Sequence, residues 1–143
     1  MNRRELMQLA ALAGTAAVTA TIAAQTKPGT TRIQMLVYPG MTLQDLVGPL
    51  QVWASWPGAE IQFAWKSTGP VPTDAGLAVI ATTSLADAWA TPDILFAPGG
   101  LLPTFELLED AEVIEFLRSR GDDPIAVTHA DKGFLLLLRA TRK

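Results

Sequence analysis

The sequence predicts an α/β domain in which a mostly parallel sheet carries helices on both faces. Short apolar segments that are typical of buried strands recur at residues 32–38, 93–97 and 124–128. Segments in which apolar residues follow helical spacing alternate with them, at residues 43–56 and 111–120. Pro and Gly stand at most junctions between the two kinds of segment, as breakers do.

The N-terminal segment does not follow this pattern. Arg3 and Arg4 precede a stretch, residues 6–26, that has no charged residue and is rich in Ala and Thr. A short basic start, a mildly apolar stretch and small residues at its end are typical of an export signal, here of the twin-arginine type. Because Ala and Thr gain little in lipid, we expect no stable membrane span after the signal is removed.

We therefore divide the chain into three parts. Residues 1–24 are expected to be the twin-arginine-like signal, residues 25–31 a linker, and residues 32–143 the folded domain. This organisation predicts a periplasmic protein. An uncleaved N-terminus that anchors the protein to the membrane is the alternative.

In the first half of the domain, residues 32–38 are expected to be a central strand that ends at Pro39 and Gly40. Thr42 is expected to cap the helix at residues 43–56, and Pro49 to kink it or remove a backbone hydrogen bond near Asp45. Residues 60–66 alternate between polar and apolar, which predicts a half-buried strand.

A hairpin and a short helix are expected next. Residues 71–73 and 77–82 flank the turn sequence Asp74-Ala75-Gly76, which predicts a β-hairpin. Ser84 is expected to cap a short helix that runs through Trp89.

In the second half, the strand at residues 93–97 leads into Pro98-Gly99-Gly100, and one or two helical turns follow at residues 103–108. Asp110 is expected to cap the helix at residues 111–120, whose acids come early and cations late, as the helix dipole favours. The strand at residues 124–128 leads into a helical run at 134–139 that is apolar on every side and should be buried.

Composition excludes several classes of function. The chain has 143 residues, of which 49% are hydrophobic, so a disordered chain is excluded. It has no Cys and one His, which excludes thiolate catalysis, disulfides and a metal site built from Cys or His. A pI near 5.0 leaves no basic surface for nucleic acid.

Four positions in the sequence are considered for a catalytic or binding role. Asp131 stands at an abrupt strand-to-helix turn, where a side chain projects above the carboxyl edge of a sheet; the alternative is a simple helix cap. Asp45 is an acid among apolar neighbours, and the alternative is a solvent-facing acid that the helix dipole favours. Gly99 and Gly100 allow backbone amides to approach a ligand, or form only a turn. His129 is interpreted as structural.

The sequences of several segments, and their order along the chain, resemble the DJ-1/PfpI superfamily, and within it most closely the isocyanide hydratase subgroup. The resemblance spans about residues 32–139 and is carried by RIQMLVYPG (32–40), QDLVGP (44–49), the hairpin region (65–83), APGG (97–100) and residues 127–133. It implies a flavodoxin-like sandwich of the class I glutamine amidotransferase-like type, commonly a homodimer, with no cofactor.

The resemblance also implies a chemistry. Isocyanide hydratases are lyases that add water to an isocyanide and release an N-substituted formamide. Their site has a Cys at the nucleophile elbow, an acid from the first helix and backbone amides at the Gly-Gly turn. By position, Asp45 matches the acid, and Gly99 and Gly100 match the amide donors.

The elbow itself departs from the family pattern. Thr128 matches the polar residue before the elbow and Gly133 the Gly after it, but Asp131 stands where the family places its Cys. Paired carboxylates at residues 45 and 131 would titrate together and could move a proton to bound water. Family members also continue beyond the elbow helix, so the C-terminal part of the fold is expected to be missing.

These departures leave three hypotheses open. In the first, the chain is an isocyanide-hydratase-like enzyme with impaired or no activity. In the second it is a non-catalytic small-molecule binding or interaction protein, and in the third it is a truncated remnant. No metal and no nucleic acid are expected in any of them.

Overall fold

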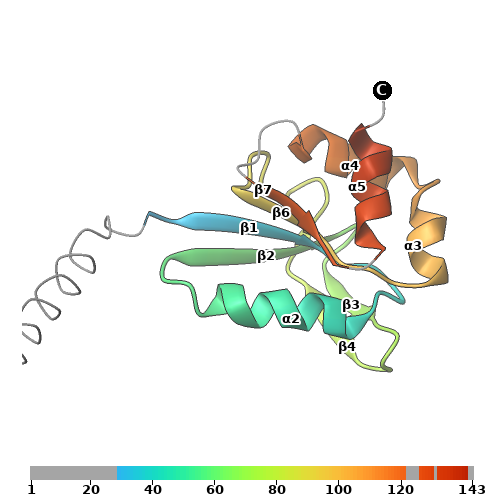
Figure 1. The fold of residues 1–143 in the computed structure, drawn as a ribbon, viewed down its shortest axis with the longest axis horizontal. Helices are drawn as coiled ribbons and strands as arrows, with labels where there is room; N and C mark the ends of the chain where they lie inside the picture. The colour runs from blue at the N-terminus through green and yellow to red at the C-terminus, as the bar shows by residue number, and fades with distance from the viewer. Residues whose placement is uncertain (1–28, 122–125, 131, 142–143) are drawn as a thin grey trace, which may run out of the picture.

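Five parallel strands form the central sheet in the order β5-β2-β1-β6-β7 (Figure 1). The computed structural model describes residues 29–121, 126–130 and 132–141. The strands are β1 (Thr31–Leu36), β2 (Ala59–Trp65), β5 (Thr83–Ser84), β6 (Ile94–Ala97) and β7 (Ala126–His129). The predicted α/β class with a mostly parallel sheet is confirmed. The signal at 1–24 and most of the linker lie outside the described residues, as do residues 124–125 of the last predicted strand.

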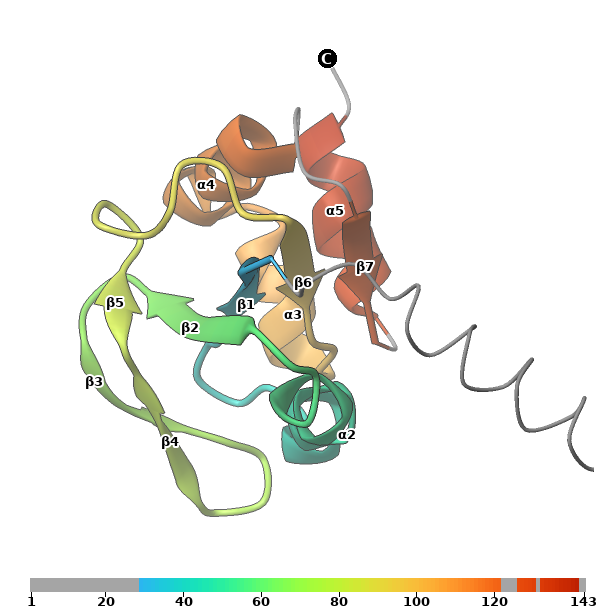
Figure 2. The same cartoon turned by 90° about the vertical axis from the view of Figure 1, so that its left-hand side faces the viewer.

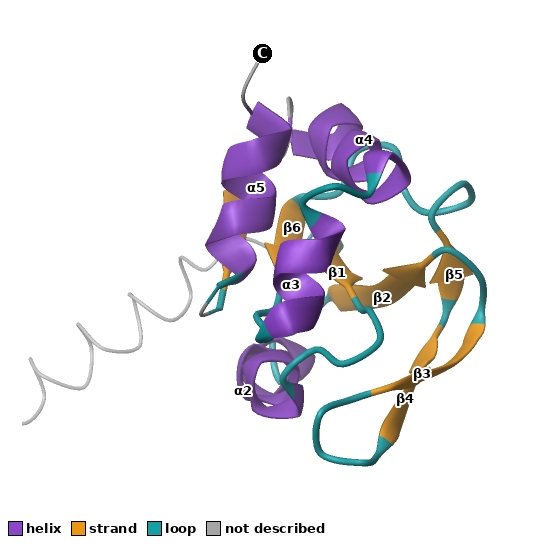
Figure 3. Ribbon diagram, turned by 90° about the vertical axis from the view of Figure 1, so that its right-hand side faces the viewer, coloured by secondary structure: helices purple, strands orange, loops and turns teal. Residues whose placement is uncertain are grey.

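Helices cover both faces of this sheet. The helix α2 (Leu43–Ala54) lies on one face, and α3 (Leu102–Leu107), α4 (Ala111–Gly121) and α5 (Gly133–Thr141) gather on the other (Figure 2). The predicted hairpin is present as β3 (Gly69–Pro72) and β4 (Ala78–Ala81), and it extends from the sheet on the side of α2 (Figure 3).

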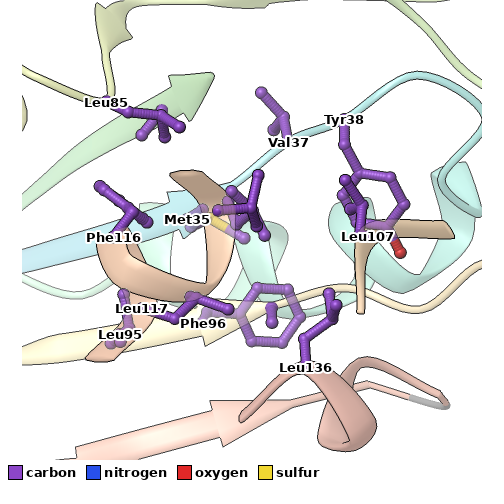
Figure 4. Packing of buried hydrophobic residues seen from close by; sticks show 14 of the residues in the cluster. Met35, Val37, Tyr38, Leu85, Leu95, Phe96, Leu107, Phe116, Leu117 and Leu136 are labelled. Carbon is purple, nitrogen blue, oxygen red and sulfur yellow. The ribbon is translucent and has the colours of Figure 1, made fainter. Parts of the chain in front are cut away.

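The core is built around the central strand. Four consecutive residues of β1, from Ile33 to Leu36, are completely buried, as a strand with neighbours on both edges and helices on both faces should be. Met35 and Phe96 are register partners in β1 and β6 and belong to the same cluster as Leu117 of α4 and Leu136 of α5 (Figure 4). The apolar helix α5 is thus part of the core.

The helix α4 begins as predicted. Asp110 Oδ1 accepts hydrogen bonds from the amides of Glu112 and Val113, each at 3.2 Å, and Lys66 Nζ lies 2.6 Å from Asp110 Oδ2. Burial acts to raise the pKa of Asp110, but the bond from Lys66 and the two amides outweigh it and lower the pKa below its usual value. The bond to Asp110 raises the pKa of Lys66.

The predicted helix from Ser84 to Trp89 is wrong. Thr83 and Ser84 pair with β2 as the short strand β5, and a turn follows in which Ser84 Oγ donates to Asp87 Oδ2 at 2.6 Å. Arg120 of α4 donates to three carbonyls of this segment at 2.9–3.1 Å, those of Leu85, Ala88 and Trp89. Burial lowers the pKa of Arg120. These carbonyls are satisfied without a helix.

The helix α2 runs past Pro49 and ends at Ala54, two residues before the predicted end. Within the described ranges, no helix combines the length and apolar character that crossing a bilayer requires.

Candidate active site

The site lies at the carboxyl edge of the sheet, between β1 and β6. From β1 the chain crosses to β2 on one side, and from β6 it crosses to β7 on the other. Such a reversal leaves a crevice between the two connections, which is where ligands bind in open α/β sheets. Residues 37–42, which follow β1, and residues 98–101, which follow β6, therefore define the site.

The connection from β1 to α2 is held from two sides. Met41 forms isolated bridges with Thr73 of the hairpin and with Gly100. The amide of Thr42 donates to the carbonyl of Gly99 at 2.9 Å. The start of α2 is thus fastened directly to the Gly-Gly turn.

Hydrogen bonds also fix the orientation of the Pro98-Gly99-Gly100 turn. Tyr38 Oη donates to the carbonyl of Pro98 at 3.0 Å, and Thr104 Oγ1 donates to the carbonyl of Gly100 at 2.8 Å. The two hydroxyl oxygens also lie 2.8 Å apart. Each hydroxyl has one proton, so at any moment only two of these three contacts can be hydrogen bonds. No acceptor in the described part of the chain engages the amides of Gly99 and Gly100. Two oriented amides of this kind can stabilise developing negative charge.

Gly133 allows the start of α5 to pack closely against this turn. A Cβ atom at Gly133, the first residue of α5, would lie 2.7 Å from Pro98 O and 2.9 Å from Ala97 C, and closer still to Ala97 O. The amide of Ala130 donates to that same Ala97 carbonyl at 3.2 Å. The start of α5 therefore touches the end of β6, and only glycine fits at the contact.

The helix α2 contributes Asp45 to the site. It lies in the first turn of that helix, where its amide donates to the carbonyl of Thr42 at 3.1 Å, and its Oδ2 atom is shielded from solvent. Asp131 lies outside the described residues. The backbone of Thr128 pairs with Phe96 in β7 and its side chain also lies outside the description. The structure thus places Gly133 against Ala97 and Pro98, which directly precede Gly99 and Gly100, and links Asp45 to Gly99 through Thr42.

A hollow of about 540 Å³ opens beside the first turns of α2. Residues 42–44, Val47, Gly48, Asp74 and Ala75 line it. Its walls are mostly apolar, with Asp74 as the acidic group that faces it from the hairpin. Among the described residues, no group of three or more His, Asp or Glu side chains is placed to hold a metal ion.

The structure corrects one prediction at this place. Thr42 occupies the N-cap position of α2, but its side chain makes no capping hydrogen bond. Instead, the amide of Leu43 donates to Asp74 Oδ1 at 2.9 Å, across 31 residues of sequence. The turn sequence around Asp74 indicated a hairpin, but nothing in it indicated this long-range contact.

Known proteins are similar to this chain in sequence and in fold. No protein-family model matches the sequence. Isonitrile hydratase from Pseudomonas putida is 33% identical over 106 residues, which are 74% of this chain and 46% of that protein. A THiJ/PfpI family protein from Pseudomonas syringae is 37% identical, with a TM-score of 0.76 over 83% of this chain and 54% of that one. A DJ-1 superfamily protein from Agrobacterium tumefaciens is 25% identical, with a TM-score of 0.58 over 69% of this chain and 53% of that one.

The chain belongs to the DJ-1/PfpI superfamily. Within it, the chain is similar to isonitrile hydratase, isonitrile being another word for isocyanide. The DJ-1beta structure from Drosophila melanogaster, 20% identical, shares the fold with a TM-score of 0.64 over 78% of this chain and 60% of that one. The chain spans about half the length of the hydratase and of the first solved relative, 46% and 54%. It has no Cys at any position.

Proposed function

We propose that this DJ-1/PfpI protein is isocyanide-hydratase-like and that its hydration activity is impaired. The observation that carries the proposal is the fastening of α2, the Gly-Gly turn and the start of α5 to one another at the sheet edge. That frame keeps the amides of Gly99 and Gly100 and the acid Asp45, while the chain lacks any thiol.

The proposed reaction assigns a task to each group. Hydration joins the water oxygen to the isocyanide carbon and moves one proton to that carbon and one to the nitrogen, which gives an N-substituted formamide. The two amides would stabilise negative charge that develops during the addition, and Asp45 would pass a proton. A carboxylate at residue 131 is a much weaker nucleophile than the thiolate that the resemblance implies, so the first bond would form slowly.

Restoring the thiol tests this proposal. The parent, Asp131→Cys and the double variant Asp131→Cys/Asp45→Asn would each be given cyclohexyl isocyanide, and the formyl proton of the formamide followed by NMR. We expect the parent to stay at background, Asp131→Cys to exceed it, and the double variant to lose the gain. A parent that forms formamide as fast as Asp131→Cys, or an Asp131→Cys variant equal to background, would contradict the proposal.

The hollow beside α2 favours a second candidate, a small-molecule binding protein without turnover. In that case Asp131→Ala would change the affinity for cyclohexyl isocyanide or the melting temperature, while no variant at residue 131 would produce formamide. Isothermal titration beside the formamide assay separates the two functions.

We also propose that the protein forms a homodimer. Large apolar side chains are exposed on three parts of the molecule, and a partner chain could cover some of them. They are Val47 and Val52 of α2, Trp56 in the turn after α2, Leu77 and Ile80 of the hairpin region, and Leu101, Leu102 and Phe105 at α3. Sedimentation velocity should report a dimer that Val52→Glu weakens. A monomer at all concentrations would contradict the proposal.

A further inference from the structure

The hairpin clamps the connection between β1 and α2. The amide of Gly40 donates to Pro72 O at 2.9 Å, and the amide of Asp74 donates to Met41 O at 3.1 Å. The amide of Leu43 then donates to Asp74 Oδ1 at 2.9 Å. Asp74 therefore holds this connection twice, once through its backbone and once through its carboxylate.

The side-chain contact of Asp74 supplies what α2 lacks locally. A helix leaves its first four amides without partners inside the helix, and Ser, Thr, Asp or Asn at the N-cap normally accepts from one of them. Thr42 does not make such a bond. Asp74 takes over the task for Leu43, the first residue of α2.

The first turn of α2 depends on this contact more than most first turns do. Asp45 lies two residues after Leu43, and the residue four positions after Asp45 is Pro49. Proline has no N–H, so the usual helical hydrogen bond from residue 49 to the carbonyl of Asp45 cannot form. A first turn with one intrahelical bond fewer frays more easily when its cap is removed.

We propose that Asp74 is a positioning residue that holds the first turn of α2 and thereby sets where the carboxyl of Asp45 lies. The inference rests on the proposed role of Asp45 as the acid of the site. Asp74 itself lies on the hairpin and acts through the peptide of Leu43.

Four variants test the proposal. Asp74→Ala removes the acceptor, whereas Asp74→Asn keeps an oxygen at the same place. Asp74→Ser, with a shorter side chain, is a milder change that serves if Asp74→Ala does not fold. Asp93→Ala is the matched control, because Asp93 Oδ2 also accepts a backbone amide from far away, that of Arg32 at 2.7 Å, but at the amino end of the sheet.

Three measurements separate positioning from stability alone. Thermal melting reports the cost of losing a carboxylate–amide bond, and we expect Asp74→Ala and Asp93→Ala to lower the midpoint by similar amounts. The ¹³C carboxyl signal of Asp45 reports its surroundings. We expect Asp74→Ala to shift this signal, Asp74→Ser to shift it less, and Asp74→Asn to leave it at the parent position, with amide exchange at Leu43 about fivefold faster in Asp74→Ala.

The outcomes are distinct. An Asp45 signal that stays unchanged in Asp74→Ala, or that moves equally in Asp93→Ala, overturns the positioning role. These readouts need no turnover, so they decide the role of Asp74 even if Asp131→Cys forms no formamide. Conversely, formamide production with an unmoved Asp45 signal would leave the proposed function standing and reject the positioning role.

Discussion

Replacing Gly133 with Ala should break the contact between the elbow and the end of β6. The added Cβ would lie 2.7 Å from Pro98 O and 2.9 Å from Ala97 C, and both are backbone atoms that cannot turn aside as a flexible side chain can. Overpacking of this kind costs about 1–3 kcal/mol, and the better helix propensity of Ala returns less than about 1 kcal/mol at a helix start. We expect a net loss of about 2 kcal/mol in the free energy of unfolding.

Thermal unfolding followed by circular dichroism measures this loss. For a chain of this size, about 2 kcal/mol corresponds to a midpoint lower by about 8 °C. Gly48→Ala is the matched control, because Gly48 lies inside α2 with no atom within 4 Å of a Cβ, so Ala should stabilise the protein there by up to about 1 kcal/mol. If Gly133→Ala melts at or above the parent temperature while Gly48→Ala behaves as expected, the close approach at Gly133 is not what holds the elbow.

Three further perturbations follow. Asp110→Ala should lower the free energy of unfolding by about 1–2 kcal/mol near neutral pH in urea titrations. Because the pKa of Asp110 is lowered in the folded state, its stabilisation is present above its usual value of 3.8 and is lost as the pH falls below it, so parent and variant should converge in acid. Arg120→Met should cost about 1–3 kcal/mol in thermal melts by leaving carbonyls of the β5–β6 connection without donors, and Arg120→Lys should recover only part of it. Replacing both Arg3 and Arg4 with Lys should keep the protein in the cytoplasm in cell fractionation if the proposed export route is right, and unchanged export would reject it.

Local pattern was sufficient where the deciding interactions are local. The alternation at residues 60–66, the turn at Asp74-Ala75-Gly76 and the cap at Asp110 each depend on neighbours within a few residues, and each was predicted. For the site, the sequence pattern identified Gly99 and Gly100 as a turn at a strand end, and the resemblance identified Gly133.

The incorrect predictions have one physical cause: groups distant in sequence make the hydrogen bonds that local residues were expected to make. Thr42 had the right chemistry for a cap, but Asp74 reaches the same helix end from 31 residues away. Ser84 had the right chemistry to begin a helix, but Arg120 takes carbonyls of that segment from across the fold. Tyr38 and Thr104, which orient the Gly-Gly turn, gave no sequence signal because they meet only after β1 and α3 are in place.

The position of β1 in the sheet has a consequence during synthesis. Its partner β2 is 28 residues downstream, but its other partner β6 is 61 residues downstream. At about 5–20 residues per second, the ribosome needs roughly 3–12 s to make the chain that separates β1 from β6. During that interval the edge of β1 that will pair with β6 has no partner, and β1 contains the apolar residues Ile33, Met35 and Leu36. Exposed apolar strand edges of this kind favour association between nascent chains. A strand that is completely buried from Ile33 to Leu36 in the finished protein therefore needs shielding while the protein is made.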